Sequence, residues 1–112
     1  MTHQEEKLDV FQGVADPTRR KILRLLAKKE LSIASISDHF TISRNAVNKH
    51  LNILLRSGLV EKEKSGRETH FMLKFDPLLE IKDWLGYFDK YWDEKLLSLK
   101  KFVETNDKPE KN

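Results

Sequence analysis

The chain of 112 residues contains no cysteine. Disulfides, thiolate metal sites and cysteine nucleophiles are therefore excluded, and the fold must depend on packing alone. No apolar run approaches the length of a membrane span, and the N-terminus (MTHQEEKLDV) lacks the apolar core of a signal peptide. The simplest expectation is a cytoplasmic protein with no membrane partner. Because the sequence shows no nucleophile–base pair, phosphate-binding loop or metal cluster, we do not expect an enzyme.

Apolar residues make up 38% of the chain and charged residues 35%, which suffices for one small domain with a real core. The charge is unevenly spread. Residues 1–56 carry 10 lysines and arginines against 6 acids, whereas residues 57–112 carry 11 against 12. A basic first half weakly favours a polyanionic partner. We predict a single domain over residues 1–104, followed by a disordered tail over residues 105–112.

The stretch ISRNAVNKHLNILLRSGLV, residues 42–60, predicts one amphipathic helix. Ser43 is a suitable N-cap, and Gly58 stands where a glycine ends a helix. One face is apolar, through Val47, Leu51, Leu54 and Leu55. The other face has planar or cationic donors and no acid, namely Arg44, Asn45, Asn48, Lys49 and Asn52. Such donors suit base edges and phosphates in a DNA major groove, although an ordinary solvated face is the simpler alternative.

Shorter elements precede this helix. We expect a first helix over residues 4–14, with an apolar stripe formed by Leu8, Phe11 and Val14. Asp16 and Pro17 then begin a second helix that runs to about Lys28. Its outer face is basic and free of acids, with Arg19, Arg20, Lys21, Arg24, Lys28 and Lys29. A short third helix over residues 32–40 and a tight turn complete a helix-turn-helix.

After Gly58 the pattern changes to two short strands, residues 59–64 and 68–75. They flank Ser65-Gly66-Arg67, where Gly66 supplies the positive φ of a tight hairpin. A hairpin in this position is the wing of a winged helix. The predicted fold class is therefore mainly α with a small β-hairpin: a winged helix-turn-helix with a long C-terminal helix.

The last helix is expected to begin at Asp76-Pro77 and to run without interruption to Glu104, about 28 residues or roughly 40 Å. Its apolar side chains follow a heptad-like seam, formed by Leu78, Ile81, Leu85, Phe88, Trp92, Leu99 and Phe102. The domain ahead of it is too small to cover so long an apolar stripe. We therefore expect an interface there.

Three segments resemble the ArsR-type (ArsR/SmtB-like) winged-helix transcriptional repressors. They are ADPTRRKILRLL (residues 15–26), SRNAVNKHLNILLRSGLV (residues 43–60) and SGRETHFML in the wing. The resemblance implies a homodimeric repressor on a palindromic operator in double-stranded DNA, with dimerisation through the first and last helices. The interface residues expected on this basis are Leu8, Phe11, Leu85, Phe88, Trp92, Leu96 and Leu99.

The chain departs from the family's metal-sensing members, which carry cysteines in a motif like E-L-C-V-C-D-L. Ser32 and Ala34 stand where those cysteines would be. Other members place Asp and His ligands on the last helix, which here has Asp83, Asp89 and Asp93 but no histidine. The last helix, with Trp84-Leu85 and Tyr91-Trp92, is similar to a metal-independent branch. We expect no metal or other cofactor, with a hard-cation site across the dimer as the alternative.

The expected DNA contacts are Ser43, Arg44, Asn45, Asn48, Lys49 and His50 in the helix and Arg67 in the wing. Arg44 and Asn45 lie in the first turn, where a recognition helix usually meets base edges; Arg suits guanine and Asn suits adenine. Asn48 stands where the family usually has Ser or Thr, so the operator can differ. Lys49 and His50 are assigned to phosphate.

Several alternatives stay open. His50 can instead bond within the domain, and Arg67 can be a solvated hairpin tip. For Arg19 and Arg20 we favour a structural role over contact with the DNA backbone. At the level of function, one rival is a sensor with an unknown effector at the aromatic dimer interface. The other is a winged-helix module that binds proteins.

Overall fold

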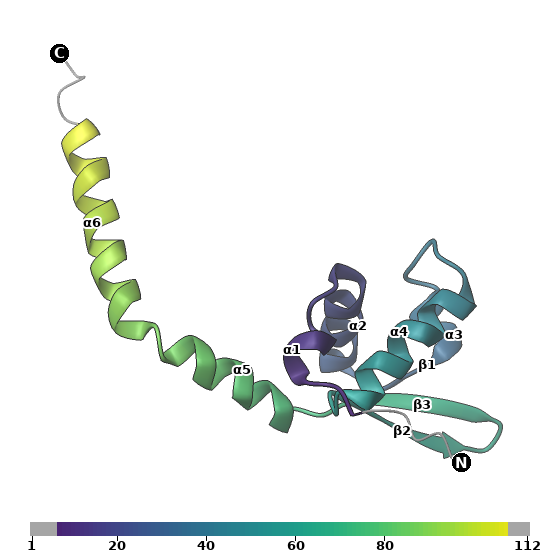
Figure 1. Cartoon of the computed structure of the whole chain (residues 1–112). Helices are drawn as coiled ribbons and strands as arrows, with labels where there is room; N and C mark the ends of the chain where they lie inside the picture. Colours follow the sequence, from purple (N-terminus) through teal and green to yellow (C-terminus); the bar gives the residue numbers. More distant parts are fainter. Residues whose placement is uncertain (1–6, 108–112) are drawn as a thin grey trace. The chain divides into compact units, whose positions relative to one another are not determined.

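A computed structural model describes residues 7–107 (Figure 1). The elements are α1 (Val10–Gly13), α2 (Pro17–Lys28), β1 (Leu31–Ser32), α3 (Ile33–Ser37), α4 (Arg44–Arg56), β2 (Val60–Ser65), β3 (Glu68–Leu73), α5 (Asp76–Gly86) and α6 (Asp89–Asp107). The chain divides into two units, residues 1–81 and 82–112. The first unit holds α1 to α4 and the sheet. Within residues 7–107, no helix combines the length and apolar character of a membrane span.

The N-terminal caps predicted for α2 and α4 are confirmed, and α3 is capped in the same way. The side chain of Asp16 accepts a hydrogen bond from the backbone N–H of Arg19, and Pro17 is the first residue of α2. Ser32 caps α3 and Ser43 caps α4, each through its hydroxyl oxygen. These short side chains satisfy backbone donors that have no partner inside the helix, which fixes where each helix begins.

The end of α4 is a Schellman motif. The N–H of Gly58 donates to the carbonyl of Leu55 at 3.1 Å, and the N–H of Leu59 donates to that of Leu54 at 3.0 Å. Gly58 has a φ of +75°, which residues with a Cβ adopt only with strain. The motif turns the chain from α4 directly into β2.

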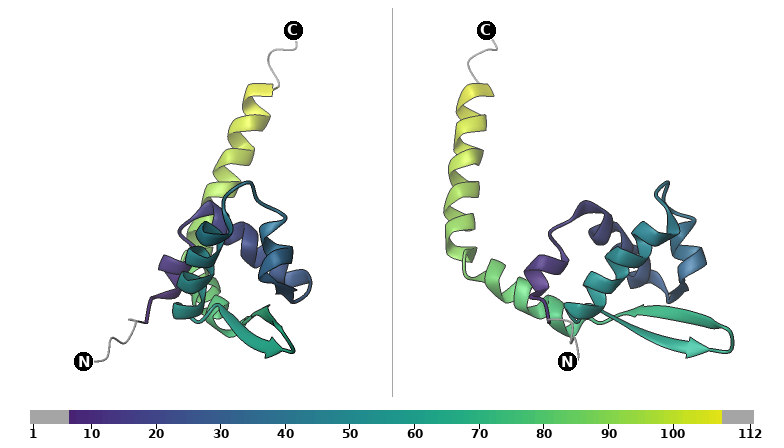
Figure 2. Two further views of the ribbon diagram at one scale, coloured as in Figure 1. Left: turned by 90° about the vertical axis from the view of Figure 1, so that its right-hand side faces the viewer. Right: turned by 45° about the vertical axis from the view of Figure 1, so that its right-hand side comes forward.

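The core of the first unit lies between α2, α3, α4 and the sheet (Figure 2). Its most deeply buried side chains are Ile22, Ile36, Val47, Leu51, Leu54 and Leu59. Each contributes on the order of 1.5–3 kcal/mol through burial of apolar surface. The apolar face predicted for α4 therefore holds this helix in the unit and leaves its polar face outward.

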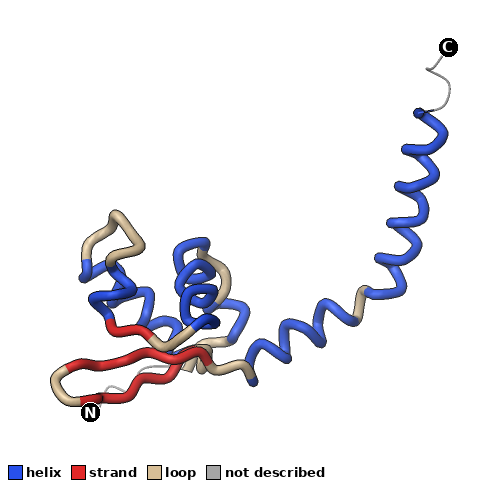
Figure 3. The backbone as a smooth tube through the Cα atoms, turned by 180° about the vertical axis from the view of Figure 1, so that it is seen from behind, coloured by secondary structure: helices blue, strands red, loops and turns tan. Residues whose placement is uncertain are grey.

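The sheet has three antiparallel strands in the order β1-β3-β2. The β2–β3 hairpin extends beyond the helices of this unit (Figure 3). Gly66 has a φ of +64° at the first central position of the turn, as in type II′ hairpins. Strand β1 was not predicted: it pairs only two residues, Leu31 and Ser32, with β3. So short a strand carries no alternating pattern, and the predicted hairpin is in fact part of a three-stranded sheet.

The first helix is shorter than predicted. Residues 4–6 lie outside the described residues, and α1 occupies only Val10–Gly13. Asp9 caps it, with its carboxylate accepting from Phe11 N–H at 2.7 Å while its own N–H donates to Gln12 Oε1 at 2.8 Å. Leu8 lies outside the helix, and its N–H donates to the carbonyl of Arg56 in α4 at 3.0 Å. The helix therefore begins at its cap, Asp9, whereas the predicted helix over residues 4–14 had Asp9 at its middle.

The long last helix is interrupted, contrary to the prediction. α5 ends at Gly86 and α6 begins at Asp89. The N–H of Tyr87 is shared between the carbonyls of Asp83 and Trp84, and that of Phe88 donates to Leu85 three residues back. Glycine is the weakest helix former after proline, and an acid such as Asp89 favours a new N-terminus. Residues 105–107 of the predicted tail are helical, and residues 108–112 lie outside the described residues.

Gly13 is required where α1 approaches the end of α4. A Cβ at this position would lie 2.5 Å from Ser57 Oγ and 2.6 Å from Leu59 Cδ1. Ser57 is buried, and its hydroxyl donates to the carbonyls of Ile53 and Leu54, so it has little freedom to move. Gly13→Ala is expected to destabilise the protein by about 1–3 kcal/mol in urea unfolding.

Gly86→Ala is the matched control, since a Cβ there would meet only Asp89 Oδ2 at 3.8 Å. Alanine at this position should leave the stability unchanged or raise it. Equal effects of the two substitutions would show that α1 does not pack tightly on α4.

Candidate nucleic-acid interface

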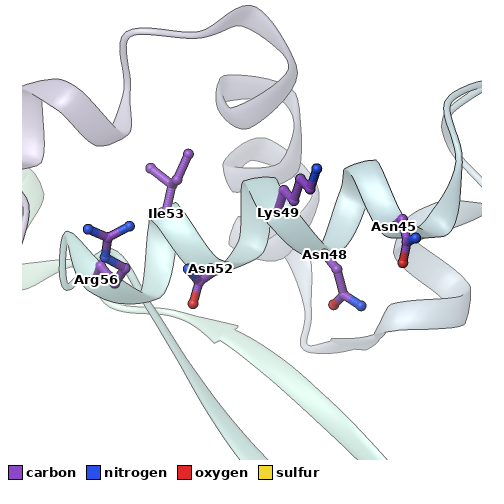
Figure 4. A pocket seen from close by; sticks show the side chains of 6 residues that line it. All are labelled: Asn45, Asn48, Lys49, Asn52, Ile53 and Arg56. Atoms are coloured by element: carbon purple, nitrogen blue, oxygen red, sulfur yellow. The ribbon is translucent and has the colours of Figure 1, made fainter. Parts of the chain in front are cut away.

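The exposed face of α4 is the candidate site. Six of its side chains line a shallow open groove of about 580 Å³ (Figure 4): Asn45, Asn48, Lys49, Asn52, Ile53 and Arg56. Asn48 and Asn52 project from one side of this face, and Lys49 and Ile53 from the other. No acid occurs anywhere in α4. A helix surface that offers amide and cationic donors without carboxylates is suited to base edges and phosphates.

The structure brings most of the predicted contacts together at the solvent side of α4. Arg44, Asn45, Asn48 and Lys49 are all exposed in its first half. Ser43 is exposed as well, and its hydroxyl already accepts the N–H of Ala46 at 3.1 Å. Arg67 is exposed at the tip of the β2–β3 hairpin.

The predicted contact set did not extend to the second half of this face. Asn52, Ile53 and Arg56 continue the groove towards the C-terminus of α4. The signal was available in the sequence, because Asn52 follows Asn48 by four residues and Asn45 by seven. This spacing keeps all three asparagines on one side of a helix.

His50 is placed differently from the other predicted contacts. It is half-buried, with Nδ1 3.3 Å from the Arg19 guanidinium and 3.9 Å from Asp16 Oδ2. Partial burial alone would raise the pKa of Asp16, but the backbone N–H of Arg19 and the neighbouring His50 hold it below its ordinary value. This arrangement links α4 to the start of α2 and favours the alternative in which His50 bonds within the domain.

Part of the basic face of α2 is engaged inside the first unit. Arg19 donates to the carbonyls of Gly13 at 2.8 Å and Gln12 at 3.0 Å, and Arg20 donates to that of Val14 at 2.9 Å. Lys21 donates to the carbonyl of His39 at 3.0 Å and lies over the ring of Phe40. Arg19 and Arg20 therefore hold α1 in place, and Lys21 fastens the turn that leads to α4.

His70 in β3 lies between two carboxylates. Its Nε2 is 3.1 Å from Glu68 Oε1, and its Nδ1 is 3.2 Å from Glu30 Oε1. The hydrogen bond to Glu68 raises the pKa of His70 above its ordinary value, and Glu30 adds to this effect. Within residues 7–107, no three acids, histidines or cysteines are grouped so as to hold a metal ion.

Comparisons with known proteins point to one family. The sequence profile of "Bacterial regulatory protein, arsR family" matches residues 16–62, which span α2 to β2. The transcriptional repressor SdpR of Bacillus subtilis is 33% identical over 88 residues, covering 79% of this chain and 98% of SdpR. The chain belongs to the ArsR family. The resemblance inferred from the α2, α4 and wing segments is thereby confirmed.

Two further transcriptional regulators extend the match. A solved ArsR-like transcriptional regulator from Rhodococcus sp. RHA1 is 34% identical, with a TM-score of 0.68, covering 86% of this chain and 88% of that one. The transcriptional activator HlyU of Vibrio cholerae is 31% identical over 64 residues, or 57% of this chain and 59% of HlyU. The ArsR-family chain is thus a DNA-binding transcriptional regulator with a winged helix-turn-helix fold, and its relatives are named as transcriptional regulators.

Proposed function

We propose that the chain is a homodimeric, cytoplasmic repressor of a palindromic operator, with α4 of each protomer in one major groove. The acid-free exposed face of α4 carries this proposal. Two such helices related by a two-fold axis read half-sites about one helical turn apart. A dimer seated in this way represses by blocking access of polymerase to the promoter.

The proposed division of labour follows exposure and chemistry. Arg44 and Asn45 in the first turn of α4 read base edges, with Asn48 one turn further along the helix. Ser43, Lys49 and Arg67 contact phosphates, Arg67 from the wing. His50, which was assigned to phosphate from the sequence, is left out of the proposed contacts, because it already faces Arg19 and Asp16.

The second unit supports dimerisation. Trp92, Leu96 and Leu99 of α6 are each more than half exposed, at 52%, 59% and 57%. Apolar side chains exposed along so much of a 19-residue helix usually mark an interface. We assign a second copy of the chain as the partner, since a palindromic site requires a two-fold assembly.

The remaining predicted interface residues differ in how exposed they are. Leu85 is exposed, whereas Phe88 is half-buried and packs edge-on against Trp84 and Tyr87, with ring centroids 5.2 Å apart in both pairs. Phe11 packs against the core of the first unit and Leu8 is half-buried. We therefore propose that α6 supplies more of the dimer contact than the two N-terminal residues do.

A ligand-responsive regulator is the second candidate. An apolar hollow of about 320 Å³ at the start of α6 is lined by Tyr91, Trp92 and Lys95 of that helix and by Phe88 just before it. Aromatic walls beside one lysine suit a small carboxylate that has an apolar body. Titrating aromatic and aliphatic carboxylates against the DNA complex tests this: release of DNA supports the sensor, and no response removes it.

We propose that DNA binding does not depend on a metal. Ser32, which caps α3, and Ala34 occupy the positions of the two cysteines in the family's metal-sensing motif. The thiolate ligands of that motif therefore have no counterpart here. Operator binding should be the same with a chelator and with added zinc. A change in affinity under either condition would contradict metal independence.

Arg44→Ala is expected to weaken operator binding by about 1–3 kcal/mol and to relax the base preference at one position of each half-site. The physical reason is loss of a bidentate pair with guanine. Fluorescence anisotropy on the operator and on random duplex measures the difference. If affinity for both duplexes falls equally, Arg44 contacts phosphate and not a base.

A further inference from the structure

The asparagines of α4 form an amide ridge, which we define as Asn45, Asn48 and Asn52. All three line the groove on the exposed face of this helix. Asn45 and Asn48 are exposed, and Asn52 is half-buried. In the described part of the chain, no side-chain hydrogen bond engages any of the three amides. Their donors and acceptors therefore remain available to a ligand.

An amide on this surface has a specific complement in duplex DNA. Adenine presents N7 as an acceptor and N6 as a donor in the major groove, and the carboxamide of asparagine pairs with both at once. Guanine presents two acceptors there and cannot form the same pair. Because α4 contains no carboxylate, it has no group of the kind that prefers the N4 donor of cytosine.

The length of the ridge fits a short run of base pairs. Seven residues separate Asn45 from Asn52, which corresponds to about 10 Å along the helix. Base pairs stack about 3.4 Å apart, so the ridge spans roughly three steps of duplex. A helix lying along the groove thus presents amides to a block of about four consecutive base pairs.

We propose that the amide ridge makes each half-site of the operator rich in adenine over such a block, and that Asn52 is a specificity-determining residue. The inference rests on the proposed function, since it assumes that α4 enters the major groove. It adds the class of sequence that the regulator recognises. Arg44, nearer the N-terminus of α4, then reads a guanine at one border of the adenine block.

Selection from a random duplex pool by the full chain tests the composition of the site. The expected result is a block of about four A·T pairs in each half-site. Replacing single adenines of that block by 7-deazaadenine removes N7 and keeps base pairing, and should weaken binding about 5-fold or more at a contacted position. These measurements use the unaltered protein, so folding of a variant does not enter.

A double cycle then assigns Asn52. Asn52→Ala should lose the preference for adenine at one position by about 5- to 150-fold, and 7-deazaadenine at that position should have no further effect. Asn52→Gln should keep part of the preference, because glutamine forms the same pair. Lys49→Ala is the matched control from the same face, and it should weaken all duplexes alike.

The possible results separate the adenine assignment, the role of Asn52 and the proposed function. Enrichment of G·C pairs across the block would overturn the adenine assignment and leave the operator-binding proposal intact. Unchanged sensitivity to 7-deazaadenine in Asn52→Ala would remove Asn52 from base readout. If no duplex is enriched and binding does not depend on salt, the proposed function itself is wrong.

Discussion

Trp92→Glu is expected to convert the dimer into monomers and to lower operator affinity by about 100- to 10,000-fold. A carboxylate in an apolar interface loses its hydration without gaining a partner, so association becomes unfavourable. The two α4 helices then bind their half-sites independently, and the avidity gained by linking them is lost. Sedimentation velocity gives the oligomeric state, and anisotropy with operator DNA gives the affinity.

The matched control is Glu94→Lys, two residues further along α6 and off the apolar seam. It changes the charge of the same helix and should preserve both the dimer and operator binding. A Trp92→Glu variant that still sediments as a dimer would overturn the assignment of α6 to the interface.

Raising the salt concentration from 50 to 200 mM is expected to weaken operator binding by about 150-fold. Lys49 and Arg67 of each protomer are the proposed cationic phosphate contacts, four in the dimer, and their counterions return to the DNA when the complex dissociates. Lys49→Ala removes one contact per protomer. The same change in salt should then cost only about 12-fold, because the logarithmic slope is roughly halved.

Anisotropy titrations at four salt concentrations give the slopes. Lys101 is an exposed lysine of α6 outside the proposed DNA contacts. Lys101→Ala should therefore give the same slope as the unaltered protein. Salt-independent DNA binding would favour the protein-interaction module, in which the winged helix contacts another protein.

Features fixed by a single side chain were predicted most accurately. Asp16 and Ser43 set the starts of α2 and α4, and Gly58 sets the end of α4, because each supplies a bond or a φ value that few residues supply as well. The donor face of α4 followed from these boundaries and from 3.6-residue periodicity. The resemblance to the ArsR family rested on the same segments.

Features that depend on distant contacts were missed. β1 exists because β3 offers partners 38 and 40 residues away, and the two residues Leu31 and Ser32 carry no pattern that would predict a strand. The inward position of His50 depends on Arg19, which Gly13 and Gln12 hold in place. The break at Gly86 is a different case, since the glycine was visible but the heptad-like seam appeared continuous across it.

Strand β2 lies at an edge of the sheet, paired with β3 on one side only. Its exposed residues 61–64 are Glu, Lys, Glu and Lys in turn. A strand edge with dense alternating charge resists the addition of a further strand from another molecule. Self-association by β-pairing is thereby discouraged even at high protein concentration. In the proposed dimer, association therefore falls to the helices and not to the edge of this sheet.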